Sequence, residues 1–577
     1  MASLQPVRVK GHTYWRIVES RRVNGKPRPV PVLYLGKADD LLARLRAAET
    51  VKVRSLAHGH VAALHSLAAE LDIAGAIDRV LASSGRRAPA TRRPAKTAAP
   101  RPSDGLSVGQ SLVLAAVGRA CHPTSKRGFA DWAQTTTLAE LTGVDTSRLT
   151  SQHFWDQMDQ VPVEAVPLIE RDVLARVLER FEIPLETLLF DATNFFTFIA
   201  STNTKASLPA RGHQKQKRDD LRQVGVALLC SRAGGIPLWH CTYGGNVSDA
   251  KCFAAALPLL HARLRELKRD IDCITFVYDK GNVSLANQAL VDQAKLHYVT
   301  ALTAASQRGL VDEANAHMTP VLVDGDVIPV FRSQRMIWDQ QRTAVVLVSQ
   351  RLQDGQARGV LQHVASATKW LDDLASTLAR GTQRRDRARI QRDIETRLKG
   401  RQFLGRVLKF HLTGEDPKLS LAYEFDNAAF EALRDTTLGR VVLITSRHDW
   451  STPDIISTYH SQAHIEAVFR NWKDPLHVSI RPQFHWTDQK LHVHVLLCVL
   501  AYLLARLLLL RARQVDPALD SIRALLDRLA RIRLATVALP LPHGKWRVTS
   551  QLEEMDEAEA ALWRGLGLVH TSQTLPR

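Results

Sequence analysis

The sequence predicts a mixed α/β protein with several domains, and three observations support this prediction. At 577 residues the chain is long enough for three or four domains and a large buried core. Residues 181–297 alternate short β-rich runs, bounded by turns, with helical segments, as in an α/β layer whose strands lie inside. Residues 298–447 depart from this pattern, because strand-like pieces there flank a long charged helical stretch. We therefore expect a β-rich inserted α+β domain within the main layer.

The chain before this layer predicts a hairpin followed by helices. Residues 7–35 alternate apolar and basic residues around Asn24-Gly25, the local signature of a β-hairpin. With the helical pattern after it, the hairpin forms a module of residues 1–85. Residues 86–104 are a Pro-rich basic linker that cannot bury a core. Residues 105–180 read as helical, with N-caps expected at Ser107 and Ser151.

The C-terminal third returns to the main layer. Residues 448–515 are predicted to be its second part. They end in an apolar run, 495–510, which Arg506 interrupts and which falls short of the roughly 20 residues that a bilayer requires. This run predicts a buried core helix. Residues 516–577 are expected to be helical and could serve in dimerisation.

Charge and cysteine usage narrow the class of partner and the compartment. The formal net charge of +19 indicates a polyanionic partner, most plausibly nucleic acid, with a membrane surface as the competing polyanion. The N-terminus lacks the apolar region of a signal peptide, and the six cysteines form no CxxC pair, so we expect free thiols in the cytoplasm. A zinc site could be drawn from Cys230, His240, Cys241 and Cys252, but their spacing matches no zinc pattern and predicts a structural role.

Three acids stand out as candidates for chemistry. Asp191 closes the run LLFD and Asp279 closes the run FVYD, so each carboxylate would be held at the end of a buried strand, where ligands bind. Both motifs could equally be turns. The third acid, Glu466, lies in YHSQAHIEAVFRNWK (459–473). As one helix, this stretch would place Tyr459, Gln462, Glu466, Arg470 and Lys473 on one face and Ile465, Val468, Phe469 and Trp472 on the adjoining face.

The pattern suits metal-dependent phosphoryl transfer. Mg²⁺ prefers oxygen ligands, and two such ions held by carboxylates can activate the attacking oxygen and stabilise the leaving oxygen of a phosphodiester. Cations beside Glu466 would hold the DNA backbone. The plainer interpretation is that Glu466 and Arg470 form an ordinary i,i+4 surface pair.

These motifs in this order resemble the DDE transposases of bacterial insertion sequences. The spacing fits the subgroup with a β-rich insertion between the second Asp and the Glu: 279 − 191 = 88 and 466 − 279 = 187 residues. The subgroup signature is Tyr-(2)-Arg-(3)-Glu-(6)-Lys. Here Tyr459, Glu466 and Lys473 are in register, while Gln462 stands where the family usually has Arg. The segment 215–249, with Gly245, Asn246 and Asp249, extends the resemblance to nearly the full chain.

The resemblance implies an RNase H-like catalytic core, formed by residues 181–297 and 448–515, that cleaves the ends of an element and joins them to target DNA. Asp191, Asp279 and Glu466 would ligate Mg²⁺, with Mn²⁺ able to substitute. The DNA-binding residues would be Tyr459, Gln462, Arg470, Lys473, Lys215, Lys217 and Arg218. A homodimer would assemble on terminal inverted repeats, and residues 105–180 could bind the DNA ends.

Two other functions remain open at this point. A nuclease with the same core would share the acids and cut DNA without joining it. An inactive relic of a transposase would bind DNA only. Strand-transfer products separate the first from a transposase, and degenerate inverted repeats around the gene would indicate the second.

Overall fold

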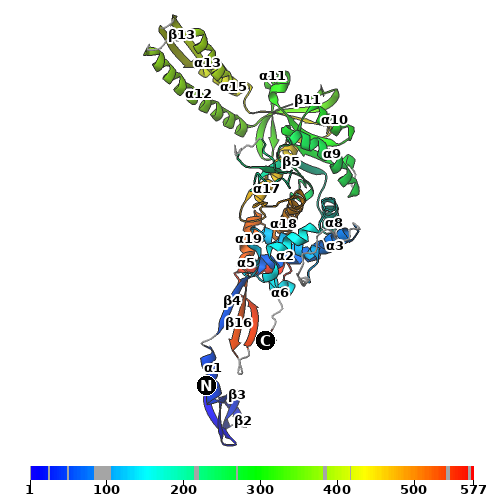
Figure 1. Cartoon of the computed structure of the whole chain (residues 1–577), viewed down its shortest axis with the longest axis vertical. Coiled ribbons are helices and arrows are strands. Elements are labelled where there is room, and N and C mark those ends of the chain that lie inside the picture. Colours follow the sequence, from blue (N-terminus) through cyan, green and yellow to red (C-terminus); the bar gives the residue numbers. More distant parts are fainter. Residues whose placement is uncertain are drawn as a thin grey trace. The chain divides into compact units, whose positions relative to one another are not determined.

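The computed structural model describes residues 2–23, 26–48, 51–83, 105–212, 220–267, 271–380, 386–415, 418–540, 546–569 and 574–576. The chain divides into two compact units (Figure 1). The sheet unit comprises residues 181–196 and 207–470, and the helical unit comprises residues 1–180, 197–206 and 471–577. All six cysteines are free thiols, as predicted.

A nine-stranded mixed sheet forms the centre of the sheet unit, which confirms the predicted mixed α/β class. The strand order is β10-β11-β12-β15-β9-β8-β5-β6-β7. β5 runs parallel to β8, and β8 parallel to β9, whereas the other neighbours are antiparallel. The strands are β5 (Thr187–Phe196), β6 (Gln223–Ser231), β7 (Pro237–Gly244), β8 (Thr275–Tyr278), β9 (His297–Leu302), β10 (Thr319–Val323), β11 (Asp326–Ile337), β12 (Gln340–Val348) and β15 (Arg440–Thr445).

Helices cover both faces of this sheet. On one face, Phe253 of α9 (Asp249–Glu266) packs on Phe190 and Tyr278, and α10 (Leu285–Gln293) lies beside α9 (Figure 1). On the other face, Ile455 and Ile456 of α16 (Thr452–His460) pack in an apolar cluster with residues of β9, β12 and β15. The inner strands, such as β6 and β8, are buried on both sides, which explains their nearly continuous apolar runs, whereas β10 and β11 are largely exposed.

The segment predicted as an inserted domain, residues 298–447, has two parts. Its first boundary falls inside β9, and β10–β12 with β15 extend the core sheet. Residues 350–438 leave between β12 and β15 and build their own apolar cluster, which includes Leu371, Ile394 and Leu412. The elements are α12 (Gln350–Ala379), α13 (Arg387–Lys399), α14 (Leu404–Val407), β13 (Leu408–Glu415), β14 (Lys418–Phe425) and α15 (Asn427–Thr436).

The helical unit is built around α18 (Asp488–Val515). This helix is long and apolar enough to cross a membrane by length and composition, yet 89% of the window that meets this test is buried inside the fold. It is the predicted core helix. α18 packs on α2 (Gly59–Glu70), α4 (Val108–Cys121), α8 (Ala165–Arg180) and α19 (Ile522–Arg531), among other helices. Ser107 caps α4 as predicted, with a capping box to Gln110, whereas Thr150, not Ser151, caps α7 (Ser151–Asp159).

Two small sheets differ from the predictions at the chain ends. The N-terminal hairpin gains a third strand, because β1 (Ala2–Val9) pairs with β2 (His12–Val23), which pairs with β3 (Lys26–Lys37). The predicted turn residues Asn24 and Gly25 lie outside the described residues. The C-terminal region, expected to be helical, contributes β16 (Arg533–Pro540), β17 (Trp546–Leu552) and β18 (Thr574–Pro576) to a sheet with β4 (Lys52–Ala57). A pairing between residues nearly 500 positions apart leaves no local signal.

Glu70 in the helical unit forms ion pairs with two arginines, and we expect its contribution to the stability of the fold to be lost in acid. Arg511 and Arg180 donate hydrogen bonds to Glu70, and chiefly the Arg511 bond lowers the pKa of Glu70 from 4.5 to about 2. A depressed folded-state pKa contributes stability above pH 4.5 that is lost as the pH falls through 2. We therefore expect Glu70→Gln to destabilise the protein at pH 7 more than at pH 3 in urea unfolding. The exposed Glu179→Gln should show little difference from wild type at either pH, and an equal Glu70→Gln effect at both would contradict the prediction.

Candidate active site on the central sheet

Asp191 and Asp279 lie on neighbouring parallel strands. β5 and β8 pair from Thr187↔Thr275 to Phe190↔Tyr278, so each aspartate is the first residue after the last pair. Successive side chains of a strand point to opposite faces. Because Phe190 and Tyr278 pack on α9, the two aspartates are directed to the other face, which α16 covers. The structure thus brings together two acids that are 88 residues apart in the sequence.

The surroundings of the two aspartates differ. Contrary to the sequence prediction, Asp191 does not end its strand: β5 continues to Phe196, because residues 191–196 still pair with β6 after β8 has ended. The backbone N–H of Ala192 donates to Asp191 Oδ1 at 2.7 Å. Asp279 does end its strand and precedes a 3₁₀ turn, 280–282. Its carboxylate accepts no hydrogen bond from the backbone N–H groups of this turn. Asn282, at the end of this turn, is 1% exposed, and its Oδ1 has no hydrogen-bond partner among the described residues.

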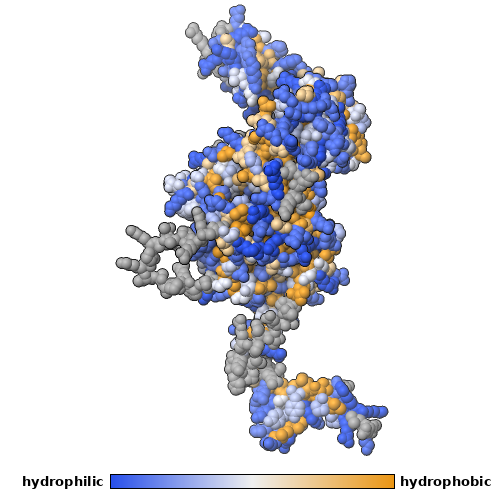
Figure 2. Space-filling model, turned by 90° about the vertical axis from the view of Figure 1, so that its right-hand side faces the viewer, coloured by the Kyte–Doolittle hydropathy of each residue, from blue (hydrophilic) through white to orange (hydrophobic). Residues whose placement is uncertain are grey.

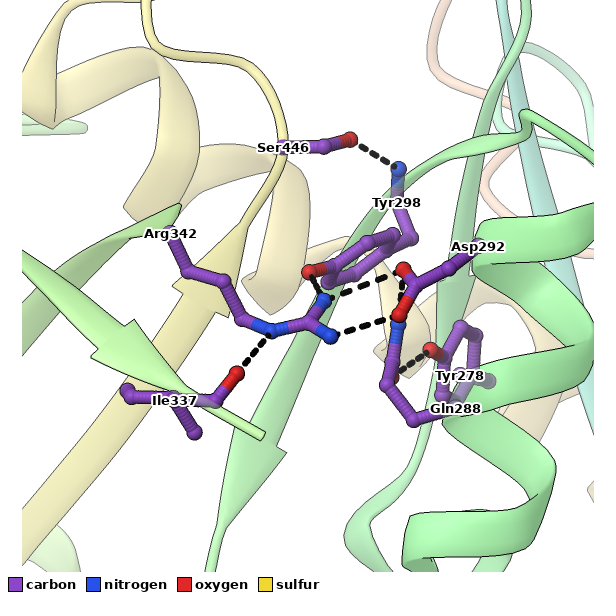
Figure 3. Close-up of polar contacts among 7 residues, drawn as sticks. All are labelled: Tyr278, Gln288, Asp292, Tyr298, Ile337, Arg342 and Ser446. Carbon is purple, nitrogen blue, oxygen red and sulfur yellow. Dashed lines mark hydrogen bonds and ion pairs between the residues drawn. The ribbon is translucent and has the colours of Figure 1, made fainter. Parts of the chain in front are cut away.

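A buried polar network holds the strand that precedes Asp279 (Figure 3). The Tyr278 hydroxyl donates to Gln288 Oε1 at 2.8 Å, and Gln288 donates to Asp292 at 3.1 Å. Asp292 in turn accepts two bonds from Arg342 of β12, at 3.2 and 2.6 Å. Arg342 also donates to the Tyr298 hydroxyl and to the Ile337 carbonyl. The network therefore joins β9, β11 and β12 to α10 and to the residue before Asp279.

Two helices, not one, carry the third motif. α16 ends at His460, Ser461 follows with ψ −10°, and α17 (Gln462–Lys473) begins again. The Ser461 hydroxyl donates to the Thr458 carbonyl at 2.5 Å, and this local bond competes with continuous helix. The residues of the predicted face are thus divided between two helices, with Tyr459 on α16 and Gln462 at the start of α17. The predicted apolar stripe is confirmed: Ile465, Val468, Phe469 and Trp472 are all buried.

Arg232, which sequence reasoning missed, ties these helices to the sheet. It follows β6, and its guanidinium donates to the hydroxyls of Thr458 and Ser457 at 3.0 Å each. The His464 Nδ1 lies 3.1 Å from its carbonyl oxygen. Arg232 lies in a turn without periodic neighbours, so no sequence pattern distinguishes it from a solvated arginine.

The pKa of Tyr459 responds to the charges of both Asp279 and Glu466. Burial raises the pKa of Tyr459 above its ordinary value of 10, and the negative charges of Asp279 and Glu466 raise it further. Its phenol therefore stays protonated at neutral pH and keeps a hydrogen to donate. In the same way, burial first, and then Cys252, Asp249 and Asp191, raise the pKa of Tyr243 on β7.

Glu466 itself remains open to solvent. Its side chain is 63% exposed, and its carboxylate lies 3.7 Å from Arg470, which is 68% exposed. Within the described residues, no three His, Cys, Asp or Glu side chains form a group that could hold a metal ion. Neither the three acids nor the alternative Cys/His set is therefore closed into a ligand shell. The three acids offer carboxylate oxygens, which are the ligands that Mg²⁺ prefers.

The other predicted DNA-binding residues lie in different settings. The Nε2 atom of Gln462, the first residue of α17, is buried and has no hydrogen-bond partner among the described residues. Lys473 ends α17 and belongs to the helical unit. Lys215, Lys217 and Arg218 lie outside the described residues.

Comparison with known proteins gives a distant likeness among solved structures and no match in sequence. No family model and no curated protein matches the sequence. Among solved structures, the chain is similar to the piggyBac transposase in a cryo-EM structure of its synaptic complex with hairpin DNA. The TM-score is 0.36 at 9% sequence identity, over 80% of this chain and 77% of that chain. A likeness this loose assigns no role to any residue.

Proposed function

We propose that this protein is a DDE-type DNA transposase, which cleaves DNA at the ends of an insertion sequence and joins those ends to target DNA. The observation that carries the proposal is the pair Asp191 and Asp279, which follow the last residue pair of two parallel strands. Beyond burial, the charges of Asp279 and Glu466 both contribute to raising the pKa of Tyr459. The mixed sheet around the pair is compatible with an RNase H-like core.

The donor set fits a hard divalent cation. Asp191, Asp279 and Glu466 would hold Mg²⁺ or Mn²⁺, and the unpartnered Oδ1 of Asn282 is a further oxygen three residues from Asp279. When bound, such an ion supplies Lewis acidity to phosphoryl oxygens and lowers the pKa of bound water. The exposed position of Glu466 means that its carboxylate must leave Arg470 to join the two aspartates.

The polar residues around Glu466 would bind the DNA strand. The protonated Tyr459 hydroxyl can donate to a phosphate oxygen, and the buried Nε2 of Gln462 has an unused hydrogen to donate. Gln462 supplies no charge, so Arg470, once released from Glu466, would provide the cation that pairs with the backbone. Lys473, Lys215, Lys217 and Arg218 would be further DNA-binding residues. Terminal inverted repeats, target DNA and a second copy of the chain are the partners of this proposal.

The test is strand cleavage and joining by the purified full-length chain with Mg²⁺ and a duplex that carries the repeat flanking the gene. We expect joined products from wild type and none from Glu466→Gln, which keeps the size of the side chain and removes its charge. Glu395→Gln, on the distant α13, serves as the control and should retain activity. Cleavage without joining would establish a nuclease instead. Equal binding of the repeat by both proteins with no cleavage by either would establish a DNA-binding relic.

A further inference from the structure

The N-terminal sheet carries a two-stranded ribbon that extends past its third strand. β1 pairs with β2 only from Val9↔His12 to Ala2↔Glu19. β2 and β3 continue to pair beyond this point, from Ser20↔Pro29 to Val23↔Lys26. We call these residues, 20–23 and 26–29, the arm. Register shifts between Trp15 and Arg16 and between Ile17 and Val18 lie at the base of the arm and increase the local twist of the ribbon.

The arm concentrates positive charge that nothing within it balances. Its four cations are Arg21, Arg22, Lys26 and Arg28, and its eight residues include no acid. Arg21 and Arg28 are directly opposed across the two strands, an arrangement of like charges that destabilises a sheet. Glu19, just outside the arm, lies 3.1 Å from Arg21, but the Arg21 side chain remains 62% exposed. An anionic partner would relieve the repulsion between the opposed arginines.

The backbone of the arm is unsuited to pairing with a further strand. Pro27 and Pro29 lie on β3, whose outer edge pairs with no strand among the described residues, and proline has no N–H to donate to a ladder. Strand addition by a protein partner is therefore disfavoured, and contact must be made through side chains. Besides prolines, the arm holds one apolar residue, Val23, which is too little to insert into a bilayer.

We propose that the arm binds double-stranded DNA, with the ribbon in a groove and its four cations on the flanking phosphates. A two-stranded β-ribbon fits the major groove, which is about 12 Å wide. The outer end of the N-terminal module is hydrophilic in Figure 2, as such a contact requires. The inference rests on the proposed function for its choice of polyanion, but it assigns DNA contact to residues that lie outside the catalytic sheet.

The test measures the affinity of the full-length chain for a labelled duplex of unrelated sequence, by fluorescence anisotropy across a range of salt concentrations. Each phosphate contact contributes about −0.9 to the slope of log K against log salt. The variant Arg21→Gln/Arg22→Gln/Lys26→Gln/Arg28→Gln should therefore lose about 3 to 4 from the magnitude of the slope. The charge-matched control Arg351→Gln/Arg358→Gln/Lys369→Gln/Arg380→Gln, on α12 and at its end, should retain the wild-type slope.

A conservative variant separates charge from folding. Arg21→Lys/Arg28→Lys keeps both charges and should keep the wild-type slope, and no variant should unfold at a lower temperature than wild type. Three results would each overturn the inference. The first is an unchanged salt slope in the quadruple arm variant, and the second is an equal loss of slope in the control. The third is binding to phosphatidylserine vesicles that depends on the arm when DNA binding does not. Cleavage assays test the proposed function separately. If the arm binds DNA but the chain cuts none, the inference about the arm stands and the proposed function fails. If the chain cuts DNA but the quadruple arm variant has the wild-type salt slope, only the inference about the arm is overturned.

Discussion

Asp279→Asn is expected to lower DNA strand cleavage by about 10³-fold or more while the protein stays folded and continues to bind DNA. The substitution preserves the shape of the side chain and removes the charge that a divalent cation needs, and such a cation supplies several kcal/mol of transition-state stabilisation, at about 1.4 kcal/mol for each tenfold change in rate. Asp279 makes no side-chain capping bond, so its replacement should cost little stability. Asp191→Asn should behave in the same way, because the amide oxygen of Asn can still accept from the Ala192 N–H.

Single-turnover cleavage of the repeat duplex measures this effect, with anisotropy on the same duplex as the measure of binding. Asp326→Asn, an exposed acid at the start of β11, is the matched control and should cleave at the wild-type rate. Calorimetric titration of the chain with Mn²⁺ gives a second readout, in which both active-site variants should bind more weakly than wild type. Full activity in either variant would remove that aspartate from the catalytic site.

Arg342→Leu is expected to destabilise the sheet unit strongly. Arg342 is 1% exposed. Its removal leaves Asp292, whose side chain is 25% exposed, and the Tyr298 hydroxyl without their arginine partner. Breaking a buried ion pair by removing one partner costs about 3–5 kcal/mol, and the partial exposure of Asp292 places this case near the lower value. Lysine cannot replace the two parallel bonds to Asp292, so Arg342→Lys should recover only part of the loss.

Urea unfolding of the full-length chain, followed by tyrosine and tryptophan fluorescence, measures this loss as a shift in the transition of the sheet unit. Arg335→Leu on the neighbouring strand β11 removes an arginine from a more exposed pair with Glu313 and should have a much smaller effect. The double variant Arg342→Leu/Asp292→Leu should regain stability, because no uncompensated charge remains. A loss in Arg342→Leu no greater than in Arg335→Leu would mean that the network in Figure 3 contributes little.

Local patterns predicted much of the fold. The apolar runs around residues 190 and 277 are buried strands, and the stripe from Ile465 to Trp472 is buried because a period of 3.6 residues fixes which side chains face the core. The end of β5 could not be predicted, since it depends on pairing with β6, which extends past the end of β8. The sheet of β4 with β16–β18 depends likewise on a partner distant in the sequence, because β4 pairs with β16. Strand β1, in contrast, pairs with β2 through the two-residue turn Lys10-Gly11, so its pairing is local.

The sequence allowed the three acids of the candidate site to be proposed, but it did not reveal the residues that hold the surrounding elements in place. Asp191, Asp279 and Glu466 lie in short motifs whose residue types carry chemistry. Arg232 and Arg342 bind through geometry that arises only when β6, β12 and the helices come together. The turn at Ser461 lies in a stretch whose residue pattern is helical throughout, so the pattern could not reveal it. The roles assigned to the acids and to the DNA-binding residues stay predictions until the variants are measured.

The segment between β12 and β15, residues 349–439, is a place where this protein could be shortened or extended. Val348 and Arg440 are paired neighbours in the sheet, so the chain leaves and returns at the same place. The closure entropy of a loop grows only slowly with its length. Replacing residues 349–439 by a tight turn would leave every strand of the sheet its pairing partners, and a different folded module could be carried at the same position. A module at this position can therefore be removed or exchanged without rebuilding the sheet that holds Asp191 and Asp279.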